Sequence, residues 1–206
     1  MKASERIIDG LKQGIDRHWR YTKNLLNVKP EYLLTVSVAD ALTDGFDGIC
    51  GLDLEIKLEE PTRRLWGSLW INAVGYKNYF PLVKQKEYEK YKMIRKGKVD
   101  IYVECNSESW IIELKGFNPS ADEIRKEIVR LTQFIAANEQ KNKCRGCYLA
   151  FPTLLDRTEW IESTVLAISG NAPFLISFES EKVETLEDPD DGMPVFYANC
   201  ISIVCI

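Results

Sequence analysis

The clearest pattern of hydrophobic and polar positions lies in residues 98–116, where KVDIYVEC and WIIEL flank the polar tip NSES. This alternation predicts two strands with one buried face, and a short polar tip between them predicts a hairpin. A two-residue turn at Asn106-Ser107 pairs positions whose numbers add up to 213. A shift of one residue would turn the buried face outward, so burial fixes the register. That face is wholly apolar and consists of Val99, Ile101, Val103, Cys105, Trp110, Ile112 and Leu114.

Helical periodicity marks the start of the chain. Residues 4–26 carry apolar side chains at three- and four-residue steps, which predicts an amphipathic helix, although Gly10 and Gly14 lower its helix propensity. A second helix is expected over 31–42, because EYLLTVSVADAL opens on a glutamate, and a helix N-terminus favours negative charge. Residues 43–51 (TDGFDGICG) are rich in turn formers and predict the end of that helix.

A further helix is expected directly after the hairpin. Ser120 and Glu123 form the pattern S-x-x-E, the capping box that marks a helix N-terminus. The residues that follow carry an apolar stripe at helical spacing, made of Ile124, Ile128, Leu131 and Ile135.

The rest of the chain supplies more short elements. They are a strand over 52–58, strand-like material over 65–83, a solvated helix or loop over 84–98, a strand over 146–155, a helix over 156–168, a strand near 173–178 and a terminal strand over 195–206. This order predicts a single α/β (α+β) domain over 1–206, with a central mixed sheet flanked by helices.

Composition narrows the functional classes. Of the 206 residues 45% are hydrophobic, which is enough for a sizeable core, and the net charge of -4 excludes nucleic-acid binding through bulk positive charge. No apolar run is long enough for a membrane span, and the charged start lacks the features of a secretory signal, so we expect a cytoplasmic protein.

The six scattered cysteines are expected as reduced thiols. His18 is the only histidine, which excludes a histidine dyad.

The polar face of the hairpin carries the candidate chemistry. In the expected register Asp100 faces Glu113, and Lys115 lies two residues further along the same face. Two opposed carboxylates destabilise a sheet unless a charge compensates them, and carboxylates suit hard cations such as Mg²⁺. A metal there would lower the pKa of its bound water, while the ammonium could assist the nucleophile. The alternative is a solvated ladder of mixed charges, in which Lys115 alone offsets the two carboxylates.

The pattern resembles the PD-(D/E)xK nuclease superfamily. It consists of GKVD, then E-L-K thirteen residues later on the next strand, a capped helix and another strand. The resemblance covers the core of the chain, about 31–152. The resemblance implies a restriction-endonuclease-like core with an N-terminal helix and a C-terminal helix and strand added to it. The family's first acid corresponds to Asp100, the acid of its E-x-K to Glu113 and the lysine to Lys115. Val99 stands where the family name has proline.

The same resemblance implies a function. Asp100 and Glu113, joined by the Leu114 carbonyl, would bind Mg²⁺ or Mn²⁺, and Lys115 would position or activate the attacking water. Glu31 is the candidate for the glutamate that many members add from the first core helix. The implied activity is hydrolysis of DNA phosphodiester bonds in restriction, repair or defence, by a homodimer or within a larger protein assembly.

Basic residues near these acids are candidates for DNA contact. Arg95, Lys96 and Lys98 directly precede the first acid, and Lys126 and Arg130 share a face of the helix after the motif. The alternative for both groups is an ordinary solvated surface.

Other motifs are interpreted as structural. Glu55-x-Lys57 also spells E-x-K, but no helix follows it, so we assign it to the first core strand, a neighbouring strand from which Glu55 could approach the metal. Cys144-x-x-Cys147 lacks the second pair of a zinc site.

The rival function is a non-catalytic module of the same fold that binds proteins or nucleic acid. The apolar segment 201–206 could pair with a partner strand.

Overall fold

The computed structural model describes residues 2–22, 31–50, 54–62, 65, 97–106, 108–136, 144–169, 174–183 and 195–205. The helices in these ranges are α1 (Ala3–Thr22), α2 (Glu31–Cys50), α5 (Ala121–Ala136) and α6 (Thr158–Ser169). The strands are β1 (Glu55–Pro61), β2 (Lys98–Cys105), β3 (Glu108–Leu114), β4 (Cys144–Thr153), β5 (Phe174–Val183) and β6 (Phe196–Cys205). The segments expected over 65–83 and 84–98 lie almost entirely outside the described residues.

The strands form one mixed sheet of six in the order β1-β2-β3-β4-β6-β5. β1, β2 and β3 are antiparallel neighbours, and β3 runs parallel to β4, with α5 making the crossover between them. β6 pairs with β4 on one side and β5 on the other, both antiparallel. The sheet therefore confirms the mixed α/β (α+β) class predicted from the sequence.

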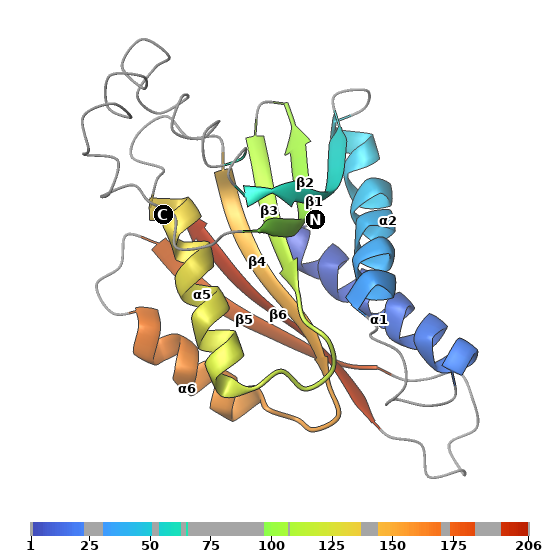
Figure 1. Cartoon of the computed structure of the whole chain (residues 1–206), viewed down its shortest axis with the longest axis vertical. Helices are drawn as coiled ribbons and strands as arrows, with labels where there is room; N and C mark the ends of the chain where they lie inside the picture. The colour runs from blue at the N-terminus through green and yellow to red at the C-terminus, as the bar shows by residue number, and fades with distance from the viewer. Residues whose placement is uncertain are drawn as a thin grey trace.

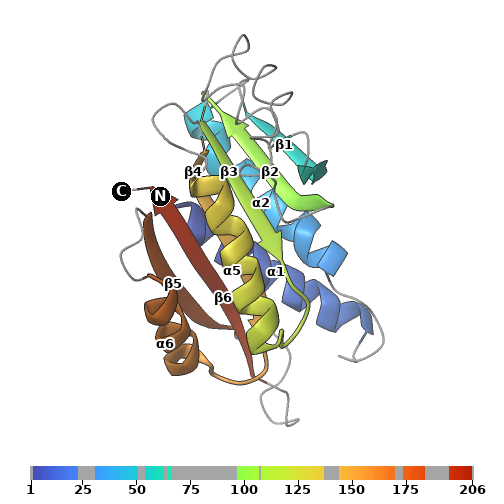
Figure 2. The same cartoon turned by 60° about the vertical axis from the view of Figure 1, so that its left-hand side comes forward.

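Helices cover both faces of the sheet. Figures 1 and 2 show α1 and α2 on one face and α5 and α6 on the other. Each helix pair buries its apolar stripe in a separate core, one containing Ile7, Leu11, Leu34, Val38 and Ile112, the other containing Ile124, Leu131, Phe134, Leu149 and Ile161. The stripe predicted after the capping box is fully or almost fully buried at all four positions.

Two glycines of α1 determine how it meets α2. A Cβ added to Gly10 would lie 2.5 Å from the Val38 Cα, and one on Gly14 would lie 2.9 Å from the Leu34 side chain. The residues that weaken the helix pattern in the sequence thus let the two helix backbones approach closely. This contact holds α2, and with it Glu31, against the rest of the fold.

Three expectations are wrong in detail. The helix expected to stop at residue 42 continues to Cys50, and Gly45 lies within it, against the Arg6 side chain of α1, rather than in a turn. Val99 is buried in the core on the α5 face rather than with Ile101. β6 lies inside the sheet with a partner on each side, so it offers no free edge to another chain.

The cysteines also differ from expectation. Cys105 is disulfide-bonded, so the prediction of six reduced thiols is wrong for this residue. Cys144, Cys147 and Cys200 are free and buried. Within the described residues, none of the helices is sufficiently long and apolar to cross a lipid bilayer.

Candidate functional site

The hairpin of β2 and β3 positions the three residues singled out by the sequence. Its ladder runs from the Cys105–Glu108 pair to the Ile101–Ile112 pair, which confirms the register in which paired numbers add up to 213. The expected pair of Asp100 with Glu113 is not part of this ladder, because both residues lie one step beyond its last pair. Both acids, together with Lys115, therefore come to the open end of the hairpin, away from its turn.

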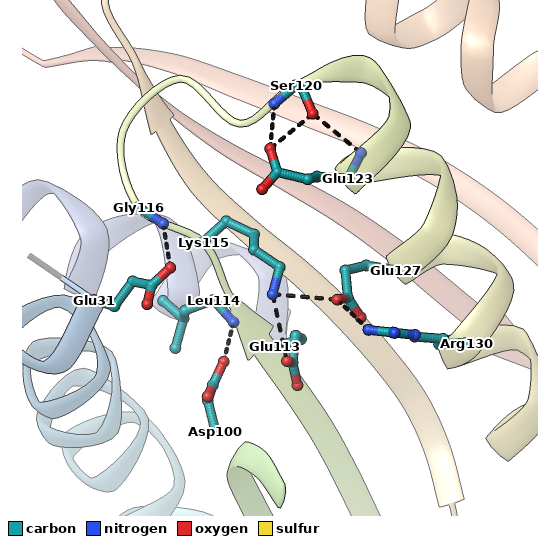
Figure 3. Close-up of polar contacts among 10 residues, drawn as sticks. All are labelled: Glu31, Asp100, Glu113, Leu114, Lys115, Gly116, Ser120, Glu123, Glu127 and Arg130. Atoms are coloured by element: carbon teal, nitrogen blue, oxygen red, sulfur yellow. Dashed lines mark hydrogen bonds and ion pairs between the residues drawn. The ribbon is translucent and has the colours of Figure 1, made fainter. Parts of the chain in front are cut away.

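Asp100 completes the hydrogen bonding of β3 at this point. Its Oδ2 accepts a hydrogen bond from the Leu114 backbone N–H at 2.7 Å (Figure 3). The side chain thus supplies an acceptor where the strand ladder has ended. An ionised acceptor makes a stronger bond to an N–H than a neutral carbonyl does, so this contact ties the first acid firmly to the E-x-K segment.

Glu31 makes the same kind of contact two residues further along. It opens α2, and its Oε1 accepts from the Gly116 N–H at 3.1 Å. On the opposite edge the Lys115 N–H donates to the Ala150 carbonyl of β4 at 3.0 Å. The chain leaving β3 is therefore held between β4 on one side and two carboxylates on the other, although the Glu31 side chain lies in an exposed position.

Glu113 and Lys115 belong to a chain of charges that continues into α5. The Glu113 side chain is only 1% exposed, and its Oε1 lies 3.7 Å from the Lys115 Nζ. The same ammonium lies 3.2 Å from the Oε1 of Glu127, which also binds Arg130 at 2.8 Å. Figure 3 shows the ammonium between the two glutamates. The lysine thus joins the sheet to the helix that packs on it.

The start of α5 confirms the predicted capping box. Ser120 N–H and Oγ donate to the Glu123 Oε2 at 2.8 and 2.7 Å, and the Glu123 N–H donates back to the Ser120 Oγ at 3.3 Å. These bonds lower the pKa of Glu123, and the nearby positive charge of Lys115 lowers it further. The cap fixes where α5 begins, and hence where Glu127 meets the sheet.

The donor atoms at the open end of the hairpin match a hard cation in type. Asp100 and Glu113 supply carboxylate oxygens from adjacent strands, and the Leu114 carbonyl belongs to the residue that Asp100 binds. Mg²⁺ is commonly held by one or two carboxylates, with water and substrate oxygens completing its coordination. No group of three or more His, Cys, Asp or Glu suited to a metal is found in the described parts of the chain. A cation here would therefore depend on two carboxylates, a carbonyl and water.

The predicted DNA-binding residues are in different situations. Lys98 binds the Glu59 carboxylate at 2.6 Å, and Lys126 lies on the exposed side of α5. Arg130 is turned toward the buried Glu127, so it takes part in the charge chain rather than in an open basic surface. Arg95 and Lys96 lie outside the described residues.

The motifs interpreted as structural lie away from this end. Glu55 is exposed, forms an ion pair with Lys57 at 2.8 Å and pairs in register with Glu104, towards the turn of the hairpin. Its approach to the candidate metal ligands, expected from the sequence, is therefore wrong. Cys144 and Cys147 are both buried, with their sulfur atoms 3.9 Å apart.

Sequence reasoning missed Glu127. Its side chain is 5% exposed, and it lies three residues after Ile124 and four before Leu131, within the apolar stripe. A single acid in such a stripe signals a buried carboxylate with a partner, and this signal could have identified it.

Comparison of the chain with models of protein families, with curated protein sequences and with solved structures found no significant match.

Proposed function

We propose that this protein is a metal-dependent nuclease that hydrolyses DNA phosphodiester bonds, with Mg²⁺ or Mn²⁺ as its cofactor. The observation that carries the proposal is the position of Asp100, Glu113 and Lys115 at one end of the hairpin (Figure 3). Asp100 accepts from the Leu114 N–H there, and Lys115 lies 3.7 Å from Glu113. The proposal also draws on the order of elements, in which α2, the hairpin, α5 and β4 follow one another as the nuclease resemblance implies.

The charges around Lys115 support a cation. Among the described residues that contact this segment, the carboxylates are Glu31, Asp100, Glu113 and Glu127, and the basic side chains are Lys115 and Arg130. A buried carboxylate needs compensating positive charge, and a divalent cation supplies two positive charges. When bound by Asp100, Glu113 and the Leu114 carbonyl, it would lower the pKa of a water molecule and polarise a phosphate oxygen.

The chain's own groups have distinct roles in this proposal. Asp100 holds the Leu114 peptide, so the carbonyl and the two acids keep a fixed relation. The Lys115 side chain is 21% exposed, and its ammonium would orient the attacking water and stabilise negative charge on the phosphate in the transition state. Glu31 fixes the Gly116 peptide and thereby the direction in which the chain leaves the lysine.

A second candidate is a non-catalytic module of the same fold that binds protein or nucleic acid. The observation in its favour is that these side chains have structural partners. Asp100 and Glu31 accept backbone hydrogen bonds, and Lys115 is paired with two glutamates. A set of charges used only to join α2, β3 and α5 would need no metal.

Plasmid nicking separates the two. The purified chain should nick supercoiled DNA with Mn²⁺ and lose this activity with a chelator, with Asp100→Asn and with Lys115→Ala. Lys57→Ala is the matched control, because it removes the lysine of the other E-x-K segment and should leave nicking intact. Nicking that survives both site substitutions would reject the site, whereas cleavage of RNA but not DNA would reject the substrate class.

A further inference from the structure

Glu127, the buried glutamate of α5, lies closer to the Lys115 ammonium than Glu113 of β3 does. Lys115 Nζ lies 3.2 Å from Glu127 Oε1 and 3.7 Å from Glu113 Oε1. The Lys115 side chain is 21% exposed, whereas both glutamate side chains are at most 5% exposed. Charges in such surroundings interact more strongly than charges on an open surface. The position of the ammonium therefore reflects a balance between two carboxylates.

That balance matters for a carboxylate that must bind a cation. Glu113 and Lys115 are two residues apart at the end of β3, so their side chains emerge on the same side of the chain. An ammonium seated on Glu113 would compete with a metal for its oxygen atoms and would repel the metal's charge. A second carboxylate that draws the ammonium toward α5 reduces this competition.

We infer that Glu127 is a positioning residue that holds Lys115 away from Glu113 and so allows Glu113 to bind the metal. The inference rests on the proposed function. It also gives Arg130 a role other than DNA contact, since Arg130 binds the same Oε1 of Glu127 and competes with Lys115 for it. Outer-shell partners of this kind commonly change metal affinity by about 10- to 100-fold when they are removed.

Isothermal titration calorimetry with Mn²⁺ on the full chain tests this without any activity assay. Glu127→Gln keeps the size and an acceptor oxygen but removes the charge, and it should weaken Mn²⁺ binding by about tenfold or more. Asp122→Asn is the matched control on α5, because Asp122 forms an i,i+3 ion pair with Arg125 and its side chain is 95% exposed. The control should bind Mn²⁺ as the wild type does.

Two further variants distinguish positioning from a merely structural tie. In a Lys115→Met background there is no ammonium to hold, so most of the loss caused by Glu127→Gln should disappear. Arg130→Gln removes a competitor for Glu127 and should keep or raise Mn²⁺ affinity, whereas a structural tie would make it behave like Glu127→Gln. Circular dichroism of each variant measures the fraction of protein that is folded, and the Mn²⁺ affinity is calculated for that fraction.

The outcomes also separate this inference from the proposed function. If Glu113→Gln loses Mn²⁺ binding and Glu127→Gln does not, the positioning role alone is overturned. The same holds if Glu127→Gln causes an equal loss of Mn²⁺ affinity in the wild-type and the Lys115→Met backgrounds. Equal binding by the wild type and Glu113→Gln overturns the nuclease site and the positioning role together.

Discussion

The Asp100 carboxylate accepts a hydrogen bond from the Leu114 backbone N–H at 2.7 Å, just beyond the last backbone pair of β2 and β3. Glu31 repeats the arrangement on the Gly116 N–H. Two acids from different elements thus supply acceptors along one edge of the segment that carries Lys115. Their contribution to the fold and their proposed contribution to catalysis are separable by experiment.

Asp100→Ala should lower the free energy of unfolding by about 1–3 kcal/mol, because the Leu114 N–H loses its acceptor in a partly buried place. Asp100→Asn retains an acceptor oxygen and should lose less. Urea denaturation of the three proteins measures the difference. Equal stability of all three proteins would show that the hydrogen bond contributes nothing. In the proposed nuclease, both variants lose Mn²⁺-dependent nicking.

His18 gives a pH dependence of stability. Burial lowers the pKa of its imidazole below the ordinary value of 6.5, so between the two values the unfolded chain binds the proton more readily than the folded chain. The free energy of unfolding therefore rises with pH across this window, and stability is lost as the pH falls below about 6.5. Urea midpoints from about pH 7 to about pH 5.5 measure the slope. Since the chain has no other histidine, His18→Leu should remove the slope; an unchanged slope would assign it to another group.

Gly10→Ala should destabilise the contact between α1 and α2. The added Cβ would meet the Val38 Cα at 2.5 Å, a backbone atom that cannot rotate away, so we expect a loss of about 1–3 kcal/mol despite the higher helix propensity of alanine. Gly14→Ala is the comparison, because its nearest neighbour is the end of the Leu34 side chain, which can move. Chemical denaturation should find Gly14→Ala the more stable of the two. The reverse order would contradict this account of the helix contact.

Ser120→Ala should lower the free energy of unfolding by about 1 kcal/mol, since it removes the side-chain half of the cap of α5. Ser163→Ala on α6 is the control, because the Ser163 hydroxyl donates to the Trp160 carbonyl within its own helix, in an exposed position. Thermal denaturation compares them. A loss in the control as large as in Ser120→Ala would mean that the cap has no special weight.

Features set by local rules were predictable from the sequence. The register of the hairpin follows from a tight turn and one apolar face, and every observed pair agrees with it. The start of α5 follows from Ser120 and Glu123, which bond to each other within one helical turn. The second E-x-K, Glu55 to Lys57, was also correctly assigned to the first strand of the sheet, although Glu55 does not approach the candidate metal ligands as expected.

Features set by packing between distant segments were not predictable in the same way. The sequence predicts a turn at Gly45, whereas in the structure Gly45 lies within α2 against Arg6 of α1. Arg130 looked like a surface base, although the direction of its side chain depends on Glu127 and, through it, on Lys115. The alternation of β2 failed at Val99, beside the point where β2 and β3 separate. In each case the deciding partner lies outside the window that a sequence pattern covers.

The position of β6 has a consequence for how the molecule assembles during synthesis. Among the described strands, β5 pairs only with β6, and β6 in turn joins it to β4. When β5 leaves the ribosome, it therefore has no neighbour in the sheet to receive it. It must wait until residues 196–205 have emerged and can lie between the two earlier strands, which makes the closing step of the sheet a late, long-range event.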